Sequence, residues 1–364
     1  ADLCIRGSNQ ESAYKLWLNR NLVLSNGKVG KSRDEMVPQR MPKLYFFKAD
    51  QKEMDLVVQV SNFNHKRGGL FNAIVIGTQS HMQQERDNRR LFAVFLFGSL
   101  VLMGVYHIIL FLLRKNDFSA LYFGLFCLWI SIRNVLTGEN ILISVFPSFN
   151  WELAIKLEYL ALYLPLLFFL LFLKSIFPQD FSKGFVRLIL LSNTILSLIT
   201  LVTPSRVFSK ITTLPFYITL IVASIGAAIF LGKALVKKRD HTGIVISGFL
   251  ILIFCAGLDV LATQRLLEIS LPQLTPFGLL LFIITQSYLL SRQFARTYHQ
   301  LDDLSQNLEE KVRLRTNELN IAKEKVEKSD REKTDFFTNL SHEIKTPLTL
   351  ISGYIESYIK ELEE

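Results

Sequence analysis

Near its C-terminal end the chain carries a run of residues, FFTNLSHEIKTPLTLISGY, whose types and spacing suit phosphoryl transfer. One set of apolar side chains recurs at helical spacing and predicts a helix with a single apolar face: Phe336, Leu340, Ile344, Leu348 and Ile351. His342 lies off this face, so its ring can present one nitrogen to an incoming γ-phosphoryl group. Glu343 follows directly, and its carboxylate can hydrogen-bond the other ring nitrogen, fix the tautomer and raise the nucleophilicity.

Two residues one turn further along the same predicted helix fit this chemistry. Thr346 follows His342 by one turn, where its hydroxyl could orient a water for the reverse hydrolysis. Pro347 removes a backbone N–H and bends the helix there, which makes the region around the histidine deformable. A lone histidine on a helix is ordinarily surface decoration, so this interpretation depends on the whole pattern.

The helix that positions His342 should begin far upstream, because residues 291–341 contain no Gly or Pro and are rich in charge. Apolar or small residues recur there at mostly heptad spacing: Leu301, Leu304, Leu308, Val312, Leu319, Ala322 and Val326. Arg315 occupies the core position that this series skips, and the two consecutive steps of four before it form a stutter. The pattern predicts a parallel dimeric coiled coil of marginal stability, with a solvated single helix as the alternative.

Half of the 364 residues are hydrophobic, and the excess lies in one block from about Leu91 to Leu290. A bilayer core requires about 20 apolar residues in a helix. On this criterion the block predicts seven membrane spans: Leu91–Leu113, Phe118–Leu136, Leu153–Leu173, Phe185–Thr203, Ile211–Val236, Thr242–Ala262 and Leu274–Leu290.

The basic residues between these spans predict the orientation. Ten lysines and arginines follow the odd-numbered spans, whereas the opposite loops carry three, Arg206, Lys210 and Arg265. Positive loops usually face the cytoplasm, so the C-terminal helix is predicted inside and the N-terminal zone outside. Much of the net charge of +9 thus reflects membrane topology, and no nucleic-acid partner is expected.

Four ionisable residues fall within the predicted spans near their outer ends: Arg133, Lys156, Glu158 and Asp259. Charges inside a membrane are costly and tend to face the interior of a bundle. One hypothesis is a polar cluster beneath the outer domain that couples ligand occupancy to helix position, with Arg133 and Asp259 as a pair. The alternative is a set of interfacial charges that reach the headgroups, or one structural ion pair.

The first 80 residues predict an extracytoplasmic β-sandwich. Short β-prone runs alternate with turn signals there: Leu3–Arg6, Tyr14–Leu18, Leu22–Leu24, Leu44–Phe47, Leu56–Val60 and Leu70–Ile76. Four residues could line a ligand site or serve as ordinary core and surface groups: Trp17, Phe63, His65 and Arg67. The three cysteines, two of them in apolar runs, indicate neither a disulfide framework nor a metal site.

The stretch around His342 closely resembles the H-box of the histidine-kinase dimerisation and phosphotransfer domain. The matching residues are Phe337, Ser341, His342, Glu343, Ile344, Lys345, Thr346, Pro347 and Leu348. The segment VQVSNFNHKRGGLFNAIVIGT, followed by the spans, is similar to bacterial seven-transmembrane receptors with diverse intracellular signalling modules. The resemblance implies a sensor histidine kinase of a two-component system, with His342 as phosphoacceptor, Glu343 in proton transfer and Thr346 in phosphatase activity.

The resemblance also implies an organisation and a set of partners. The domains would be a partial, jelly-roll-like β-sandwich sensor (1–80), a seven-transmembrane domain (91–290), a coiled-coil signalling helix (291–335) and the first helix of a phosphoacceptor four-helix bundle (336–364). A homodimer in the bacterial inner membrane, surrounded by lipid, would pass the phosphoryl group to a response-regulator Asp. The extracytoplasmic ligand stays open, with carbohydrate as one candidate.

We expect the sequence to be truncated at both ends, with a signal peptide upstream and an ATP-binding domain downstream. ATP and Mg²⁺ would be bound by that absent domain, so the fragment alone should not phosphorylate itself. Two other functions stay open. One is a seven-span transporter with a dimerising tail, and the other is a non-catalytic receptor or scaffold.

Overall fold

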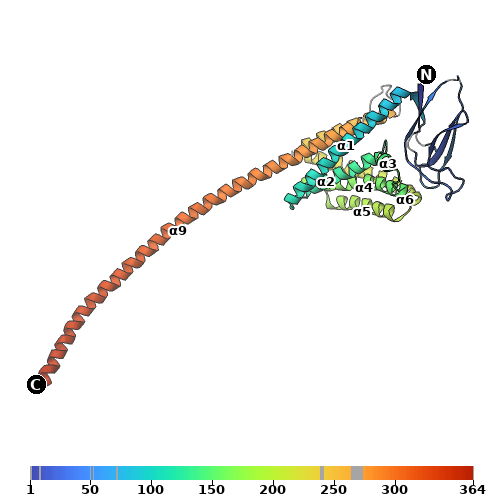
Figure 1. The fold of residues 1–364 in the computed structure, drawn as a ribbon. Helices are drawn as coiled ribbons and strands as arrows, with labels where there is room; N and C mark the ends of the chain where they lie inside the picture. Colours follow the sequence, from blue (N-terminus) through green and yellow to red (C-terminus); the bar gives the residue numbers. More distant parts are fainter. Residues whose placement is uncertain are drawn as a thin grey trace. The chain divides into compact units, whose positions relative to one another are not determined.

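The computed structural model describes residues 2–7, 10–49, 51, 53–70, 73–237, 242–263 and 274–363. It divides into two compact units, residues 1–290 and residues 291–364. The first unit contains the strands and the apolar helices, and the second is the distal part of one long helix. Figure 1 shows the order of these elements along the chain.

Two small antiparallel sheets form the N-terminal part. Their strands are β1 (Asp2–Gly7), β2 (Ala13–Leu18), β3 (Asn21–Asn26), β4 (Lys43–Lys48), β5 (Leu56–Ser61) and β6 (Val75–Thr78). One sheet has the order β4-β1-β6 and the other β3-β2-β5. Buried side chains from both sheets form one core, which consists of Ile5, Tyr14, Leu16 and Leu24. Five strands lie where the sequence predicts them, but β6 begins at Val75 and excludes Leu70, because its register with β1 covers only four residues.

Two tight turns, one before and one after β3, contain residues with positive φ. Asn19 and Arg20 have φ of 48° and 68° and join β2 to β3, as expected for a two-residue hairpin turn. Gly27, with φ of 68°, follows β3, and a Cβ there would collide with the carbonyl oxygen of Val37. Glycine is therefore required where the chain folds back along itself between residues 28 and 37.

Apolar helices follow the sheets: α1 (Gln79–Leu113), α2 (Phe118–Leu136), α3 (Ile141–Val145), α4 (Trp151–Ile176), α5 (Lys183–Val202), α6 (Ser205–Ile211), α7 (Thr213–Val236) and α8 (Thr242–Thr263). Within the described ranges, five helices are long and apolar enough to span a membrane: α1, α2, α4, α5 and α7. They correspond to the first five predicted spans. The sixth predicted span coincides with α8 and the seventh with the start of the next helix, so the total of seven stays a prediction.

Small and aromatic residues pack these helices. Gly104 of α1 faces Gly124 of α2, and a Cβ on Gly104 would lie 3.1 Å from the carbonyl oxygen of Gly124, so the two backbones approach closely. Six phenylalanines from four helices form a continuous aromatic cluster: Phe123, Phe126, Phe169, Phe172, Phe249 and Phe282. The high phenylalanine content therefore serves helix packing.

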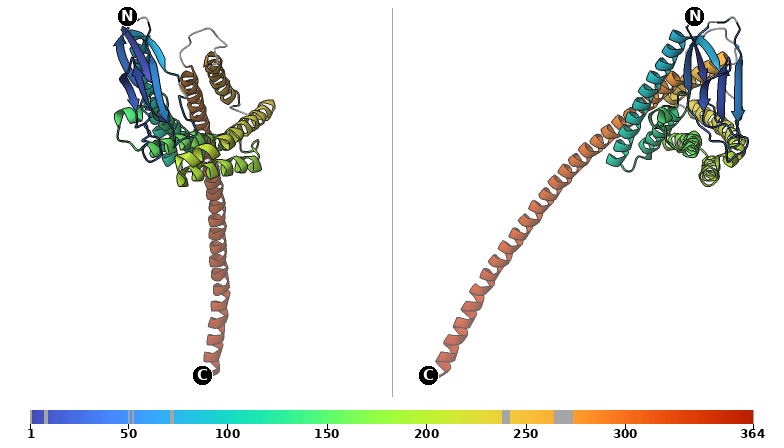
Figure 2. Two further views of the ribbon diagram at one scale, coloured as in Figure 1. Left: turned by 90° about the vertical axis from the view of Figure 1, so that its right-hand side faces the viewer. Right: turned by 45° about the vertical axis from the view of Figure 1, so that its right-hand side comes forward.

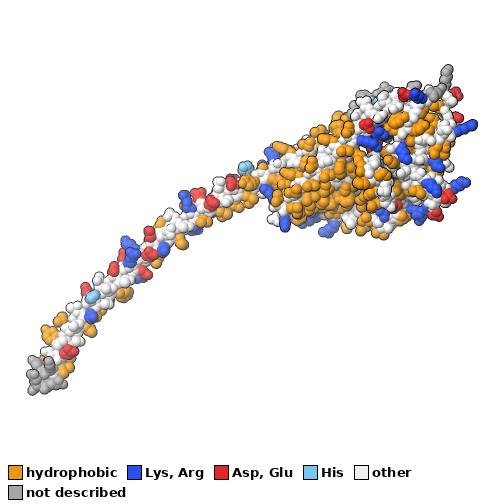
Figure 3. Space-filling model, in the orientation of Figure 1, with side chains coloured by type: hydrophobic (Ala, Val, Ile, Leu, Met, Phe, Trp, Pro, Cys, Tyr) orange, Lys and Arg blue, Asp and Glu red, His pale blue; other side chains and the backbone are white. Residues whose placement is uncertain are grey.

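The last helix, α9 (Thr275–Glu363), has 89 residues and runs without a break through Pro347. Figure 2 follows it as one ribbon, and Figure 3 shows hydrophobic side chains recurring along its length. The predicted heptad residues are exposed on it, for example Leu301 at 60% and Leu319 at 71%. A long apolar stripe left open to solvent is the surface that a partner helix would cover.

Candidate functional site

The distal part of α9 presents the predicted phosphoacceptor. His342 and Glu343 are both exposed on a regular helix, so the imidazole is accessible to a phosphoryl donor. The neighbouring apolar residues Phe336 and Ile344 are exposed at 60% and 53%, as expected for a face that a bundle partner would bury. The helix thus separates an apolar docking face from the position of the histidine.

Thr346 and Pro347 lie on the same turn of α9. The Thr346 hydroxyl donates a hydrogen bond to the carbonyl oxygen of His342 at 3.0 Å. A hydroxyl bonded to its own helix must rotate away before it can orient a water, which makes water positioning conditional on the local conformation. Pro347 contributes no backbone N–H to the helix, so the carbonyl four residues earlier lacks its usual donor.

A second group of functional side chains lies where the N-terminal sheets meet the helices. The guanidinium of Arg40, from the loop between β3 and β4, is 4% exposed and forms ion pairs with two carboxylates. One belongs to Glu158 on α4, and the other to Glu11, at 3.3 Å. The carbonyl of Arg40 also accepts a hydrogen bond from Asn140, in the turn after α2.

Buried Asn26 fixes the backbone that carries Arg40. Its Nδ2 donates to the carbonyl of Gln39 at 2.6 Å, and its Oδ1 accepts from the backbone N–H of Met41 at 3.1 Å. The side chain is fully buried, so these bonds are protected from water. The backbone on both sides of Arg40 is therefore held by Asn26, the last residue of β3.

Further contacts surround this ion-paired centre. His65 Nε2 lies 3.2 Å from the Tyr159 hydroxyl on α4, and the backbone N–H of Lys66 donates to Ser209 Oγ on α6 at 3.1 Å. Arg6 of β1 pairs at 2.6 Å with Glu139, the residue before Asn140. We call the residues joined by these contacts, Arg6, Glu11, Arg40, His65, Glu139, Glu158, Tyr159 and Ser209, the junction.

Burial sets the protonation of the junction groups outside the spans. It lowers the pKa of His65 to about 4, and because Nδ1 accepts from the backbone N–H of Arg67, the ring is held neutral with its proton on Nε2. Burial raises the pKa of Glu11, against the opposing effect of Arg40. Burial alone would lower the pKa of Arg40, but the two carboxylates outweigh it and keep the guanidinium charged.

Three of the four predicted intramembrane charges have described side chains, Arg133, Lys156 and Glu158, and the cluster of all four stays a prediction. Glu158 pairs with Arg40, whereas Lys156 donates to the carbonyl of Leu201 at 2.8 Å. Arg133 lies within electrostatic range of Glu158 and Arg40. The side chain of Asp259 lies outside the described residues, so its pairing with Arg133 stays a prediction.

Of the residues suggested as ligand-lining, His65 belongs to the junction, and Phe63 is 41% exposed. Sequence reasoning missed Arg40, Glu11 and Glu139. Pro38 and Pro42, which flank Arg40, indicate only a turn between two strands. No periodic pattern connects these residues with a helix more than 100 positions away.

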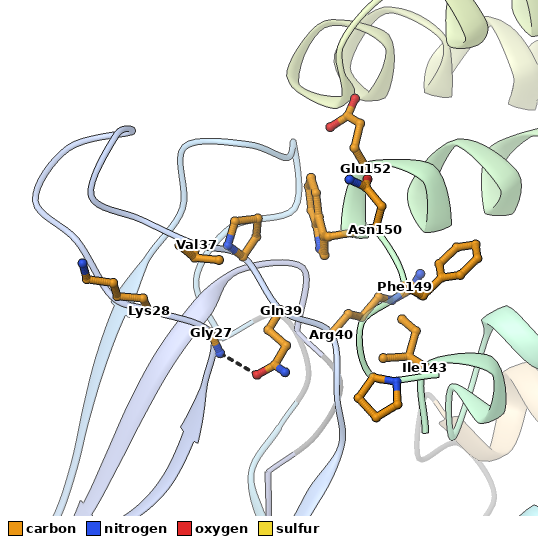
Figure 4. Close-up of a pocket in the computed structure, with 12 residues that line it drawn as sticks. Gly27, Lys28, Val37, Gln39, Arg40, Ile143, Phe149, Asn150 and Glu152 are labelled. Carbon is orange, nitrogen blue, oxygen red and sulfur yellow. Dashed lines mark hydrogen bonds between the residues drawn. The ribbon is translucent and has the colours of Figure 1, made fainter. Parts of the chain in front are cut away.

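A cavity of about 680 Å³ opens beside Arg40, between the loop of residues 27–40 and the turn from α3 into α4. Figure 4 shows Arg40 reaching from the sheet side toward the side of Ile143 and Phe149. The cavity therefore has one wall from the sheets and one from the helices. Among the described residues, no group of three or more His, Cys, Asp or Glu side chains could hold a metal ion.

Comparison with known families gives two matches. The model for 7TM diverse intracellular signalling matches residues 89–293, more than half of the chain. The model for the His Kinase A (phospho-acceptor) domain matches residues 332–364, which include His342. The comparisons with curated proteins and with solved structures give no match.

Proposed function

The chain belongs to the 7TM diverse intracellular signalling family and, with its phospho-acceptor segment, is a transmembrane sensor histidine kinase; from this premise we propose how it carries a signal. A ligand outside the membrane acts on residues 1–80 and changes the position of α4 through the junction. The helix bundle passes the change to α9, and α9 alters the presentation of His342.

The observation that carries this proposal is the ion pair between Arg40 and Glu158. It joins the sheets directly to a helix of the bundle, with both side chains largely removed from water. Removing one partner of a buried pair costs about 3–5 kcal/mol, so a displaced loop would exert a strong effect on α4. Exposed charges at the same place would transmit far less.

The reaction at His342 is an in-line phosphoryl transfer. One ring nitrogen attacks the γ-phosphorus of ATP, the bond to the bridging oxygen breaks, and ADP leaves. The attack leaves a positive charge on the ring, which Glu343 stabilises before it accepts the proton from the other ring nitrogen. Histidine kinases use ATP with Mg²⁺, and we place their binding in a domain outside residues 1–364. The phosphoryl group then passes to an Asp of a response regulator, while Thr346 positions water for the reverse hydrolysis.

We further propose a homodimer, because α9 exposes its heptad stripe and the H-box face in a single chain. Phospho-acceptor domains of this kind typically dimerise. In the dimer, residues 291–335 of the two α9 helices would pair as a coiled coil. Residues 336–364 of both helices would continue into the four-helix bundle. Seven spans in a bacterial inner membrane, with residues 1–80 outside and α9 in the cytoplasm, complete the arrangement.

The test uses the full-length protein in proteoliposomes with labelled ATP. Wild-type protein should acquire acid-labile phosphate, and His342→Gln should abolish it. His299→Gln is the matched control, because His299 is another exposed histidine on α9 outside the H-box. Retention of the label in His342→Gln would show that the phosphoacceptor lies elsewhere.

A further inference from the structure

The cavity beside Arg40 has an unusual lining. Its polar side chains are Lys28, Gln39, Arg40, Asn150, Trp151 and Glu152. Most of their acceptor atoms are already engaged by the protein. Gln39 Oε1 accepts from the backbone N–H of Gly27 at 2.9 Å, and Asn150 Oδ1 caps α4 by accepting from Leu153 N at 3.0 Å.

The one carboxylate in the lining is occupied as well. Glu152 Oε1 accepts from the backbone N–H of Ser205 at 2.6 Å, and its Oε2 lies 2.7 Å from the Ser205 hydroxyl. Gln39 and Asn150 therefore have only their NH₂ groups available to a ligand. The Glu152 carboxylate is occupied by Ser205, the first residue of α6. Lys28 is an exposed basic side chain in the same lining.

Two buried donors in the lining lack partners. Arg40 Nε and Trp151 Nε1 have no hydrogen-bond partner among the described residues, and Arg40 is 4% exposed. A buried donor without an acceptor costs about 1–3 kcal/mol. An occupant that brings acceptor atoms would remove this cost. Both atoms are shielded from solvent, so an acceptor in the cavity reaches them only when the side chains shift, whereas the NH₂ groups of Gln39 and Asn150 offer donors on the two walls.

We propose that this cavity binds a small organic carboxylate with an apolar body. A carboxylate only accepts hydrogen bonds, and its two oxygens can satisfy several donors at once. Val37, Ile143 and Phe149 supply apolar surface for the rest of the molecule. A sugar hydroxyl or an amide would bring donors of its own into a lining that already presents donors.

A ligand in the cavity would lie next to the ion pair that joins the sheets to α4. Glu152 lies in the first turn of α4 and Glu158 about two turns later, while Arg40 belongs both to the lining and to the ion pair. An occupant that engages Arg40 Nε would change how the guanidinium meets Glu158. Only this signalling consequence rests on the proposed function, because binding itself requires no kinase activity.

The test measures binding to residues 1–364 in nanodiscs by tryptophan fluorescence. The chain has three tryptophans, so Trp17→Phe with Trp129→Phe leaves Trp151 as the reporter. The probes are phenylacetate and hexanoate, each compared with its primary amide. At least one carboxylate should give a saturable change at a concentration tenfold or more below that of its amide. No saturable change with either acid, or equal binding of acid and amide, would overturn the assignment.

Variants locate the binding. Lys28→Gln should weaken carboxylate binding tenfold or more, whereas Lys31→Gln, an exposed lysine of the same loop outside the lining, should leave it unchanged. Equal binding by both variants would place the ligand elsewhere and overturn the proposal. Loss of His342 labelling with carboxylate binding intact would instead contradict the proposed function alone.

Discussion

Arg40, on the loop before β4, forms an ion pair with Glu158 on α4, and a second carboxylate, Glu11, lies 3.3 Å from the same guanidinium. The pair joins residues 118 positions apart, so it is a tertiary contact between the sheets and the helix bundle. Because Glu11 and Glu158 both pair with the Arg40 guanidinium, moving Arg40 would take the positive charge away from both carboxylates. Arg40 therefore joins the sheet part of the described structure to helix α4.

The first prediction concerns dephosphorylation. Thr346→Ala should slow the loss of phosphate from His342 or from the response regulator by about tenfold or more, because the hydroxyl no longer positions the attacking water. Autophosphorylation should stay near the wild-type level. Thr349→Ala is the matched control, since Thr349 makes the same kind of bond, to the Lys345 carbonyl at 2.8 Å. Equal phosphatase rates in both variants would remove Thr346 from the mechanism.

The second prediction concerns pH. The pKa of His65 is lowered to about 4 by burial, below its ordinary value, so the unfolded or detached loop binds a proton more readily than the docked one. Docking stability from His65 should be present above about pH 6.5 and fall by about 3 kcal/mol as pH decreases toward 4. Glu11, whose pKa is raised, acts in the opposite direction.

Hydrogen exchange of residues 62–67 in wild type and His65→Gln isolates the histidine contribution. Wild-type protection should decrease below pH 6.5 more steeply than that of His65→Gln, which retains every other titrating group. Parallel pH profiles would show that the ring does not remain neutral against Tyr159.

The third prediction concerns the coiled coil. Arg315 occupies a predicted core position, and on the single helix it forms an exposed ion pair with Glu318 at 2.9 Å. Arg315→Leu should stabilise the dimer by about 1–2 kcal/mol, because apolar surface replaces a charge in the seam. Disulfide trapping through Val312→Cys should then proceed further at equal protein concentration. Arg313→Leu, off the seam, should have no such effect, and a similar gain in both variants would contradict the assigned register.

The sequence predicts the linear elements of this molecule well. The H-box helix, five of the strands and the first five spans follow from local spacing, because helices and strands repeat their burial pattern within a few residues. α3 and α6 escaped prediction, since five and seven residues are too few to show a periodicity.

The junction could not be predicted in the same way. Residues two positions apart on a helix point about 200° apart around its axis, so Lys156 and Glu158 have different neighbours. Glu158 consequently meets Arg40, while Lys156 reaches the carbonyl of Leu201 on α5. Arg40, Glu11 and Glu139 are assembled by the turns after β3 and α2, whose course no pattern of side chains reveals.

The most direct test of the account measures labelled phosphate on His342 in full-length protein bearing Arg40→Glu, Glu158→Arg or both. Each single change should shift the label about fivefold or more, within the usual range of coupling energies. The double change should return it to within about twofold of wild type once Glu11→Gln removes the second carboxylate, which would repel a glutamate at position 40. Arg206→Glu, an exposed charge on α6, should leave it unchanged. A double variant with Glu11→Gln that is as impaired as the single ones, or single variants indistinguishable from wild type, would contradict coupling through Arg40 and Glu158.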